Sequence, residues 1–378
     1  MRGRLGSDSE RTVVRAAARV ALAAVFAALC SCAQRDQPPP PWKVVEIPTD
    51  ADFVGMWFTD SLNGWISGGG WAIDGGIVGR TRDSGRSWRF ESNVLHGAGA
   101  GVGVGQVQFR DSLHGCTVAR YGILLTEDGG ASWRTARFAD ASASLSDVQF
   151  IDARNGWALG SGLVRTEDGG ETWRMLVRSQ AENGYFSGNA LHFVDEARGW
   201  LVGHGASLMR TRDGGRSWIP VSLPLRLGER PILRDVTFVG ADHGWVVGEH
   251  GTLFHTADGG ASWTLQENGV PVVRAIPKGE RRPREIVPEL ETEPDRLALS
   301  AVQFADTSHG WAVGYYADVA ESVVLGTGDG GATWRIEHVQ PGELLRSLFV
   351  LDAGHAWAAG DRARTSPQVV LRYAPGEP

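Results

Sequence analysis

The sequence predicts an all-β protein, a seven-bladed β-propeller of four-stranded blades whose ring is closed by an N-terminal strand. Three observations carry this prediction. The motif T-x-D-[GS]-G-x-[ST]-W occurs six times, and an alternating apolar stretch that ends in Gly-Trp, or in a degenerate form of it, occurs seven times. Most copies of the motif lie 45 residues apart. Four short strands per repeat at a period of roughly 40 to 50 residues are typical of propeller blades.

The recurring motif marks the turn between the third and fourth strands of a blade. Its aspartates are separated by 45, 40, 45, 45 and 71 residues, so one interval contains an insertion. Glycine after the Asp supplies the positive φ that a tight hairpin turn requires. We expect the Asp and Trp of each copy to be structural: Asp83, Asp128, Asp168, Asp213, Asp258 and Asp329, with Trp88, Trp133, Trp173, Trp218, Trp263 and Trp334.

One repeat unit is interpreted as four strands. In the third unit these are the alternation around 148–150, then 157–160, 163–166 and a strand that begins at Trp173. Asn-Gly precedes the second strand and Asp-Gly-Gly follows the third, and both are hairpin turn signals. A β-solenoid would have a shorter repeat, and an immunoglobulin-like sandwich would not repeat.

The seventh blade is predicted to be shared between the two ends of the chain. The last Ala-Trp, at Trp357, is followed by one more strand, 369–373, and then the chain ends, so three strands come from the C-terminus. Residues 42–47 resemble the other fourth strands, with a leading Trp, a base and then alternation. We expect this segment to pair with the last blade and close the ring, which removes an open sheet edge.

Composition agrees with the repeat. The chain has 378 residues, with 51 Gly and 15 Trp. Twelve of the Trp occupy repeat positions, which leaves Trp42, Trp57 and Trp71. The net charge of −7 comes from 37 bases and 44 acids without a long block of either sign. This charge pattern argues against a nucleic-acid binder that relies on phosphate neutralisation.

Residues 1–31 are predicted to be a lipoprotein signal peptide. Five arginines precede an apolar run, 20–29, that is too short for a membrane span of about 20 residues. Leu29 and Ser31 stand three positions and one position before Cys32, as in a bacterial lipobox, so Cys32 is the expected lipidation site. An ordinary secretory signal that is cut nearby is the alternative.

Cys30 fits the lipobox less well, because Leu29 would directly precede it. Residues 32–41 are predicted to be a polar, proline-rich tether between the anchor and the propeller, 42–373. Two acyl chains supply the stable anchoring that one chain does not. Apart from Cys32, the mature chain has only Cys116, so no internal disulfide framework can form.

The motif resembles the Asp-box, or BNR, repeat. Together with the upstream F-x-D-x-x-x-G-W pattern, it resembles the photosystem II stability/assembly factor family of seven-bladed propellers and its relatives in non-photosynthetic bacteria. The resemblance covers residues 42–373 and implies that each Asp caps its turn while each Trp packs between strands. Departures are Ser84 in place of Gly, Cys116 in place of Trp, and the charged insertion 268–295, which we expect to be a mobile loop.

No catalytic site, metal site or cofactor is expected. The six motif Asp residues are predicted to lie at the periphery of separate blades, where no two can share a substrate. Turn positions account for six of the ten histidines, and the others show no H-E-x-x-H or comparable ligand spacing. A bound cation is left open as an alternative.

Asp-box propellers include sialidases, and similar repeats occur in xyloglucan hydrolases with two propellers. The sequence lacks the Arg-Ile-Pro signature of sialidases and predicts one propeller. A glycosidase also needs two placed carboxylates, and the sequence singles out no such pair. A carbohydrate-binding or glycoside-hydrolysing propeller is therefore the second hypothesis for function.

The first hypothesis is a non-enzymatic envelope lipoprotein that serves as a protein-binding scaffold or assembly factor. We expect a monomeric propeller whose partner is another envelope or membrane protein, in the bacterial cell envelope. Partner-binding loops are predicted on the face opposite the Asp-box turns, because aromatic and Arg residues anchor interfaces. The candidates are Trp71, Arg120, Tyr121, Tyr315, Tyr316, Arg362 and Arg364.

Overall fold

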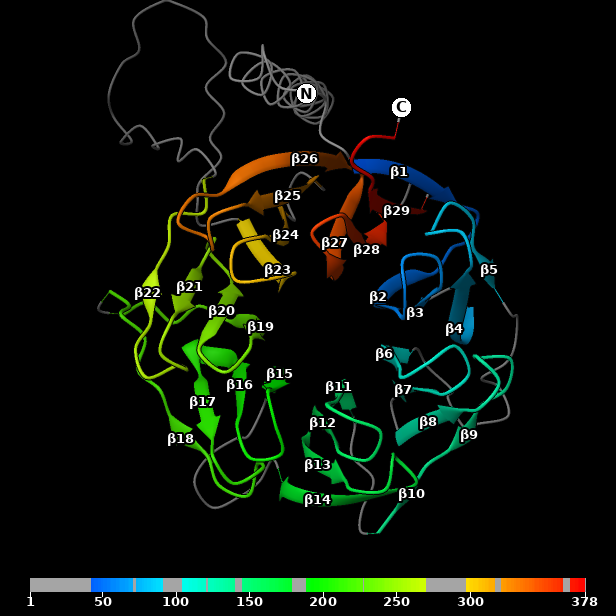
Figure 1. Ribbon diagram of the computed structural model, residues 1–378, viewed down its shortest axis with the longest axis horizontal. Coiled ribbons are helices and arrows are strands. Elements are labelled where there is room, and N and C mark those ends of the chain that lie inside the picture. The colour runs from blue at the N-terminus through cyan, green and yellow to red at the C-terminus, as the bar shows by residue number, and fades with distance from the viewer. Residues whose placement is uncertain are drawn as a thin grey trace, which may run out of the picture. The chain divides into compact units, whose positions relative to one another are not determined.

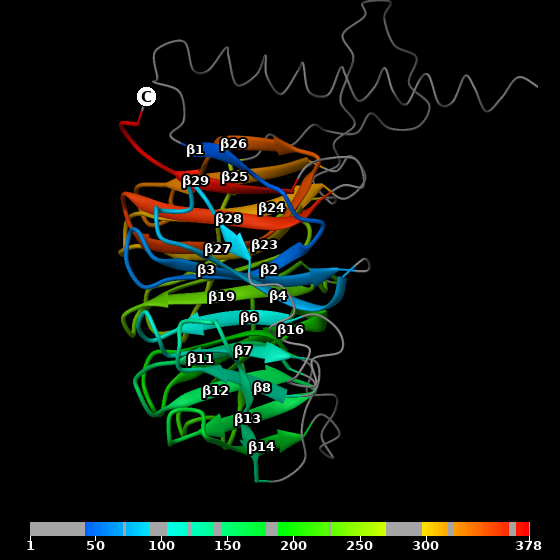
Figure 2. The same cartoon turned by 90° about the vertical axis from the view of Figure 1, so that its right-hand side faces the viewer.

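The computed structural model describes residues 42–70, 73–90, 104–119, 122–139, 145–178, 188–226, 228–269, 297–316, 321–362 and 368–377. The predicted signal peptide, the tether with Cys32 and nearly all of the insertion lie outside these ranges. Figure 1 shows the described strands as small sheets arranged around a ring, and Figure 2 shows this ring from the side. The all-β seven-bladed propeller is thereby confirmed.

Six blades are built from consecutive strands. The first three are β2 (Asp52–Phe58), β3 (Gly64–Gly70), β4 (Ile73–Thr81) and β5 (Arg89–Phe90); β6 (Val104–Phe109), β7 (Gly115–Ala119), β8 (Gly122–Thr126) and β9 (Arg134–Thr135); and β11 (Leu145–Phe150), β12 (Gly156–Gly160), β13 (Gly162–Thr166) and β14 (Thr172–Arg178). The next three are β15 (Gly188–Phe193), β16 (Gly199–Gly203), β17 (Leu208–Thr211) and β18 (Ile219–Pro220); β19 (Leu233–Val239), β20 (His243–Gly248), β21 (Leu253–Thr256) and β22 (Thr264–Leu265); and β23 (Leu297–Phe304), β24 (Gly310–Tyr316), β25 (Glu321–Thr327) and β26 (Arg335–Pro341).

The seventh blade joins the two ends of the chain. Its strands are β27 (Glu343–Asp352), β28 (His355–Arg362), β29 (Gln368–Tyr373) and β1 (Trp42–Ile47). β1 pairs antiparallel with β29 over its whole length, from Trp42 opposite Tyr373 to Ile47 opposite Gln368. Residues 42–47 are therefore the fourth strand of this blade, at the position that their sequence predicts.

Two details of the sheets differ from the sequence-based expectation. A two-residue strand, β10 (Arg137–Phe138), leaves the second blade and pairs parallel to β14 as a fifth strand of the third sheet. The fourth strands of four blades, β5, β9, β18 and β22, are also short, with two residues each. Within the described ranges, no helix is long and apolar enough to cross a membrane.

The Asp-box turns adopt one geometry, in which the Asp side chain replaces missing main-chain partners. In the third blade, Asp168 Oδ1 accepts hydrogen bonds from the Thr166 hydroxyl at 2.8 Å and the Thr172 amide at 2.9 Å. The Thr166 hydroxyl oxygen accepts the Gly170 amide at 3.0 Å. Gly169 and Gly170 have φ of 79° and 93°, which only Gly adopts without strain. The pKa of Asp168 is lowered from its usual value. Partial burial acts to raise this pKa, but the hydrogen bonds from Thr172 and Thr166 lower it by more.

Asp168→Ala is expected to destabilise the propeller by about 1 kcal/mol, because the Thr166 hydroxyl and the Thr172 amide lose their acceptor. Asp168→Asn should cost less, since its amide oxygen can still accept the Thr172 amide. Urea denaturation of both variants measures the difference. Equal stability of the wild type and Asp168→Ala would show that the carboxylate does not hold the turn.

Both tight turns of each of the first six blades lie on one face of the disc, which we call the Asp-box face. It carries the turns between first and second strands and the Asp-box turns, which bond to each other: the Ser84 amide donates to the Leu62 carbonyl at 3.0 Å, and the Gly169 amide to the Arg154 carbonyl at 2.9 Å. The connections between second and third strands, and between blades, therefore emerge on the opposite face, which we call the loop face.

Among the described residues, an aromatic pair joins five of the seven blade interfaces. The Trp that begins a second strand stacks on the Phe that ends the first strand of the next blade, with ring centroids 3.5 to 3.9 Å apart. The pairs are Trp65 with Phe109, Trp157 with Phe193, Trp200 with Phe238, Trp245 with Phe304, and Trp357 with Phe58. This stacking accounts for five of the 15 Trp residues.

Candidate functional site

The inner ends of the blades enclose a cavity of about 510 Å³ that is lined by the first strands. The first strand of a blade has no neighbouring strand on the side that faces this cavity. Side chains of the preceding blade form hydrogen bonds to that edge. Gln108 accepts the Phe150 amide at 2.6 Å and donates to the Phe150 carbonyl at 3.1 Å. Gln149 makes the same two bonds to Phe193. These amides stabilise the inner edges, which would otherwise carry unpaired groups.

Two acidic side chains that line this cavity also accept hydrogen bonds from main-chain amides of the first strands. Asp147 accepts the amides of Val148 at 2.9 Å and Leu191 at 2.9 Å, and Asp235 accepts the amides of Val236 and Val302, each at 2.8 Å. Each carboxylate thereby links its own blade to the next. Burial inside the ring raises the pKa of Asp147 to about 6.

Burial also raises the pKa of Asp235 to about 7, and the charge of Asp147 adds to the shift, although the amide of Val302 lowers it. A raised folded-state pKa means that the folded chain binds more protons than the unfolded chain, so the contribution to stability falls as the pH rises from about 4 to about 7. Asp235→Asn removes this titration. The free energy of unfolding of this variant, relative to that of the wild type, should therefore be larger at pH 8 than at pH 5, as measured by urea denaturation. A difference that does not change with pH would show that folding does not raise the pKa of Asp235.

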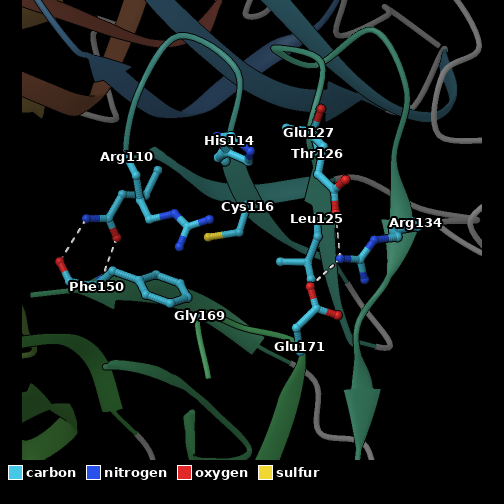
Figure 3. A pocket seen from close by; sticks show the side chains of 12 residues that line it. Arg110, His114, Cys116, Leu125, Thr126, Glu127, Arg134, Phe150, Gly169 and Glu171 are labelled. Carbon is cyan, nitrogen blue, oxygen red and sulfur yellow. Dashed lines mark hydrogen bonds and ion pairs between the residues drawn. The ribbon is translucent and has the colours of Figure 1, made fainter. Parts of the chain in front are cut away.

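A second cavity, of about 40 Å³, lies between the second and third blades on the Asp-box face. Figure 3 shows Cys116 and Leu125 on one side of it and Phe150 on the other. Cys116 begins β7, where five other blades carry the stacking Trp, and Phe150 ends β11, where the next blade supplies the stacking Phe. The cavity therefore occupies the space of a missing indole, and we call it the Cys116 slot.

The other groups that contact this indole are still present at the Cys116 slot. In the first and third blades, the indole N–H donates to a glycine carbonyl of the next Asp-box turn: Trp65 to Gly129 at 2.9 Å and Trp157 to Gly214 at 3.0 Å. The corresponding glycine here is Gly169, which lines the slot.

An arginine also accompanies the indole. Arg80 lies over the Trp65 ring at 4.9 Å and Arg165 over the Trp157 ring at 5.0 Å. The second blade has Leu125 at this strand position, and Arg110 reaches the same place from the preceding turn, where it donates to the Ala153 carbonyl at 2.7 Å. Arg110 borders the slot (Figure 3).

Charged and apolar groups surround the entrance of the Cys116 slot. Arg134 bonds to both Glu127 and Glu171 at its outer side, as Figure 3 shows. Leu113, directly before the slot residue His114, is 49% exposed. The Cys116 thiol itself is buried, and burial raises its pKa to about 12, so it is not a reactive nucleophile.

The predicted partner-binding loops are only partly described. Trp71, Arg120, Tyr121 and Arg364 lie outside the described residues. The expectation that Tyr315 and Tyr316 stand in a loop is wrong: both belong to β24, which extends further than the Gly-Trp pattern indicated, and they are 7% and 4% exposed. Tyr315 packs under the guanidinium of Arg346 at 5.2 Å.

Arg362 ends β28 on the loop face and pairs with Asp50 at 2.7 Å. Beneath it, Glu343 is fully buried and accepts the Val369 amide at 3.1 Å, and its other carboxylate oxygen has no hydrogen-bond partner. Burial raises the pKa of Glu343 to about 8, with a further contribution from Asp361.

Within the described ranges, no three His, Cys, Asp or Glu side chains are placed to hold a metal ion. The turn histidines cap aspartates instead: His114 Nδ1 lies 2.9 Å from an Asp111 oxygen, and His309 Nδ1 lies 3.0 Å from an Asp306 oxygen. The sequence did not point to the Cys116 slot as a site, although Cys116 was visible as a departure from the repeat. The signal that could have found it is the loss of Trp at 116 together with Leu125 at a position where the blades on either side have Arg80 and Arg165.

Comparison with known proteins identifies the type of propeller. The family model "Photosynthesis system II assembly factor YCF48" matches residues 135–233 and 224–274, which span the third, fourth and fifth blades. This chain is a propeller similar to the photosystem II assembly factors. The resemblance indicated by the Asp-box motif is confirmed. A search of curated proteins finds no match.

Solved structures show the same fold over the whole ring. YCF48 from Cyanidioschyzon merolae is 18% identical, with 89% of this chain and 99% of that chain covered and a TM-score of 0.65. A structure described as YCF48 bound to D1 peptide is 18% identical, with 88% and 95% covered and a TM-score of 0.63. The GH74 enzyme of Niastella koreensis is 12% identical, with 82% and 50% covered and a TM-score of 0.52. This chain thus spans about half the length of that enzyme.

Proposed function

We propose that this chain is a non-enzymatic scaffold or assembly factor that binds a protein of a membrane or envelope complex. The observation that carries the proposal is the match of three central blades to the assembly-factor family model. A propeller of the same fold has been solved with a bound peptide, so such a ring can present a surface to a protein segment. We further propose that lipid on Cys32 holds the ring at the membrane, in the bacterial cell envelope.

The second candidate, glycoside hydrolysis, has one observation in its favour. Asp147 and Asp235 line one cavity and have raised pKa values, as catalytic carboxyl groups often do. Against it, each carboxylate accepts main-chain amides from two blades, so both oxygens of each are engaged in holding the ring together. We therefore assign them a structural role.

Affinity capture of the full chain from cross-linked, detergent-solubilised membranes tests the scaffold proposal. The expected result is recovery of defined membrane or envelope proteins, and the Asp147→Asn/Asp235→Asn variant should recover the same proteins if it folds. Release of sugars from envelope glycans by the wild type, abolished in that double variant and without a captured partner, would establish the second candidate instead.

Cys32→Ser is expected to move the chain from the membrane fraction to the soluble fraction, because no acyl chain can then be attached. Cys30→Ser is the matched control and should leave the chain in the membrane fraction. Cell fractionation with immunodetection measures both. If Cys32→Ser stays with the membrane while Cys30→Ser leaves it, the anchor is Cys30.

A further inference from the structure

The second and third blades are joined differently from the five interfaces with a stacked Trp and Phe. At those interfaces an indole from the chain itself fills the space between blades. At the Cys116 slot the indole is absent, whereas the groups that would receive it remain: the Phe150 ring, the Gly169 carbonyl and the Arg110 guanidinium. The slot is also open toward the Asp-box face, where the flanking Leu113 is exposed.

We infer that the Cys116 slot is a docking site for an indole side chain, a Trp that a protein partner inserts from the Asp-box face. This inference rests on the proposed function as a protein-binding scaffold, and it deepens that function by naming the site and the chemistry of the anchor. The repeat itself indicates an indole as the occupant, because the same kinds of group hold an indole in the neighbouring blades.

The geometry of a neighbouring interface describes the expected contacts. In the third blade, Trp157 stacks on Phe193 with centroids 3.9 Å apart and planes at 6°, and its N–H donates to the Gly214 carbonyl at 3.0 Å. A partner's indole would stack on Phe150 and donate to Gly169 in the same way. Stacking on an aromatic ring and a guanidinium over the ring face both stabilise such a complex.

The cavity of about 40 Å³ is smaller than an indole, so the side chains that line it, Arg110 among them, have to shift outward. Arg80 covers Trp65 and also donates to the Ser112 carbonyl, so Arg110 can cover the inserted ring and keep its equivalent hydrogen bond to the Ala153 carbonyl.

The surface around the Cys116 slot carries the types of residue that are common at protein interfaces. Leu113 and Leu62 occupy the same turn position in adjacent blades, and they are 49% and 51% exposed. The other five blades have Arg154, Ala197, Asp242, Ser308 and Gly354 there, so this pair places large apolar side chains on one part of the Asp-box face. A buried aromatic anchor with apolar neighbours and a charged rim is the usual composition of a binding hot spot.

N-acetyl-L-tryptophanamide is the probe for the slot, detected by saturation-transfer NMR with the detergent-solubilised full chain. The expected result is transfer from the wild type and from Cys116→Ser, and loss of transfer with Cys116→Trp, in which the chain's own indole fills the slot. Cys116→Met is a second blocking variant, because its flexible side chain fills irregular space with little strain. Equal transfer to the wild type and to both blocking variants, or none to the wild type, would overturn the inference.

Partner capture separates this inference from the proposed function. Loss of the captured partner in Cys116→Trp, with retention in Cys116→Ser, supports both. Capture that is unchanged in folded Cys116→Trp overturns the docking site and leaves the scaffold function standing. Probe binding to the slot without any captured partner overturns the scaffold function and leaves the indole site standing.

Discussion

Deletion of residues 42–47 is expected to abolish the cooperative unfolding of the propeller. β1 is the outermost strand of the seventh blade, and Trp42 and Ile47 are 5% and 3% exposed. The interface to the sixth blade depends on Trp42 because Val350 stands where other blades have the stacking Phe. Trp42 and Trp311 instead both contact the ring of Tyr373, and both donate to the same oxygen of Glu337 at 3.0 and 2.9 Å.

Loss of Trp42 alone should cost about 3 to 5 kcal/mol, which is comparable to the total stability of many domains. The deletion also exposes the edge of β29, so the shortened chain should aggregate. Calorimetry and size-exclusion chromatography measure both effects. Deletion of residues 34–39 from the tether is the matched control and should leave the melting transition unchanged. A deletion of 42–47 that melts like the wild type would show that β1 does not close the ring.

Trp157→Ala is expected to destabilise the propeller by about 3 to 5 kcal/mol. Its side chain is fully buried, and the substitution removes both the stack on Phe193 and the hydrogen bond to Gly214. Cys116→Ala, at the same position of the preceding blade, is the matched control and should cost only about 1 kcal/mol, because a thiol fills far less space.

Urea denaturation at one pH gives the two free energies of unfolding. A similar loss for Trp157→Ala and Cys116→Ala would contradict the view that the slot at Cys116 lacks a packing partner that the other interfaces have.

The architecture follows from the sequence because its decisive residues are local and repeated. Each Asp-box turn is specified by residues within the motif, as the contacts of Asp168 with Thr166 and Thr172 show. The pairing of β1 with β29 was also predictable, since residues 42–47 have the pattern of a fourth strand and the last blade lacks one.

Features that depend on contacts between distant residues were not predictable in the same way. Tyr315 looked like a loop residue because the repeat pattern ends near Gly314, but β24 and β25 extend together and bury it. The Cys116 slot exists because Arg110, from the turn after β6, takes the place that Arg80 and Arg165 have in the blades on either side, while nothing replaces the indole. A single position in the sequence does not reveal such a combination.

We propose that this propeller works as a binding scaffold and not as an enzyme. The most direct test is native electrophoresis of gently solubilised membranes, with immunodetection of the full chain. We expect the chain to migrate within a complex well above its monomer position, and to move to the monomer position when mild denaturant dissociates the partner. A chain that migrates only as a monomer under all solubilisation conditions, with turnover of envelope glycans in the same fraction, would contradict the scaffold function.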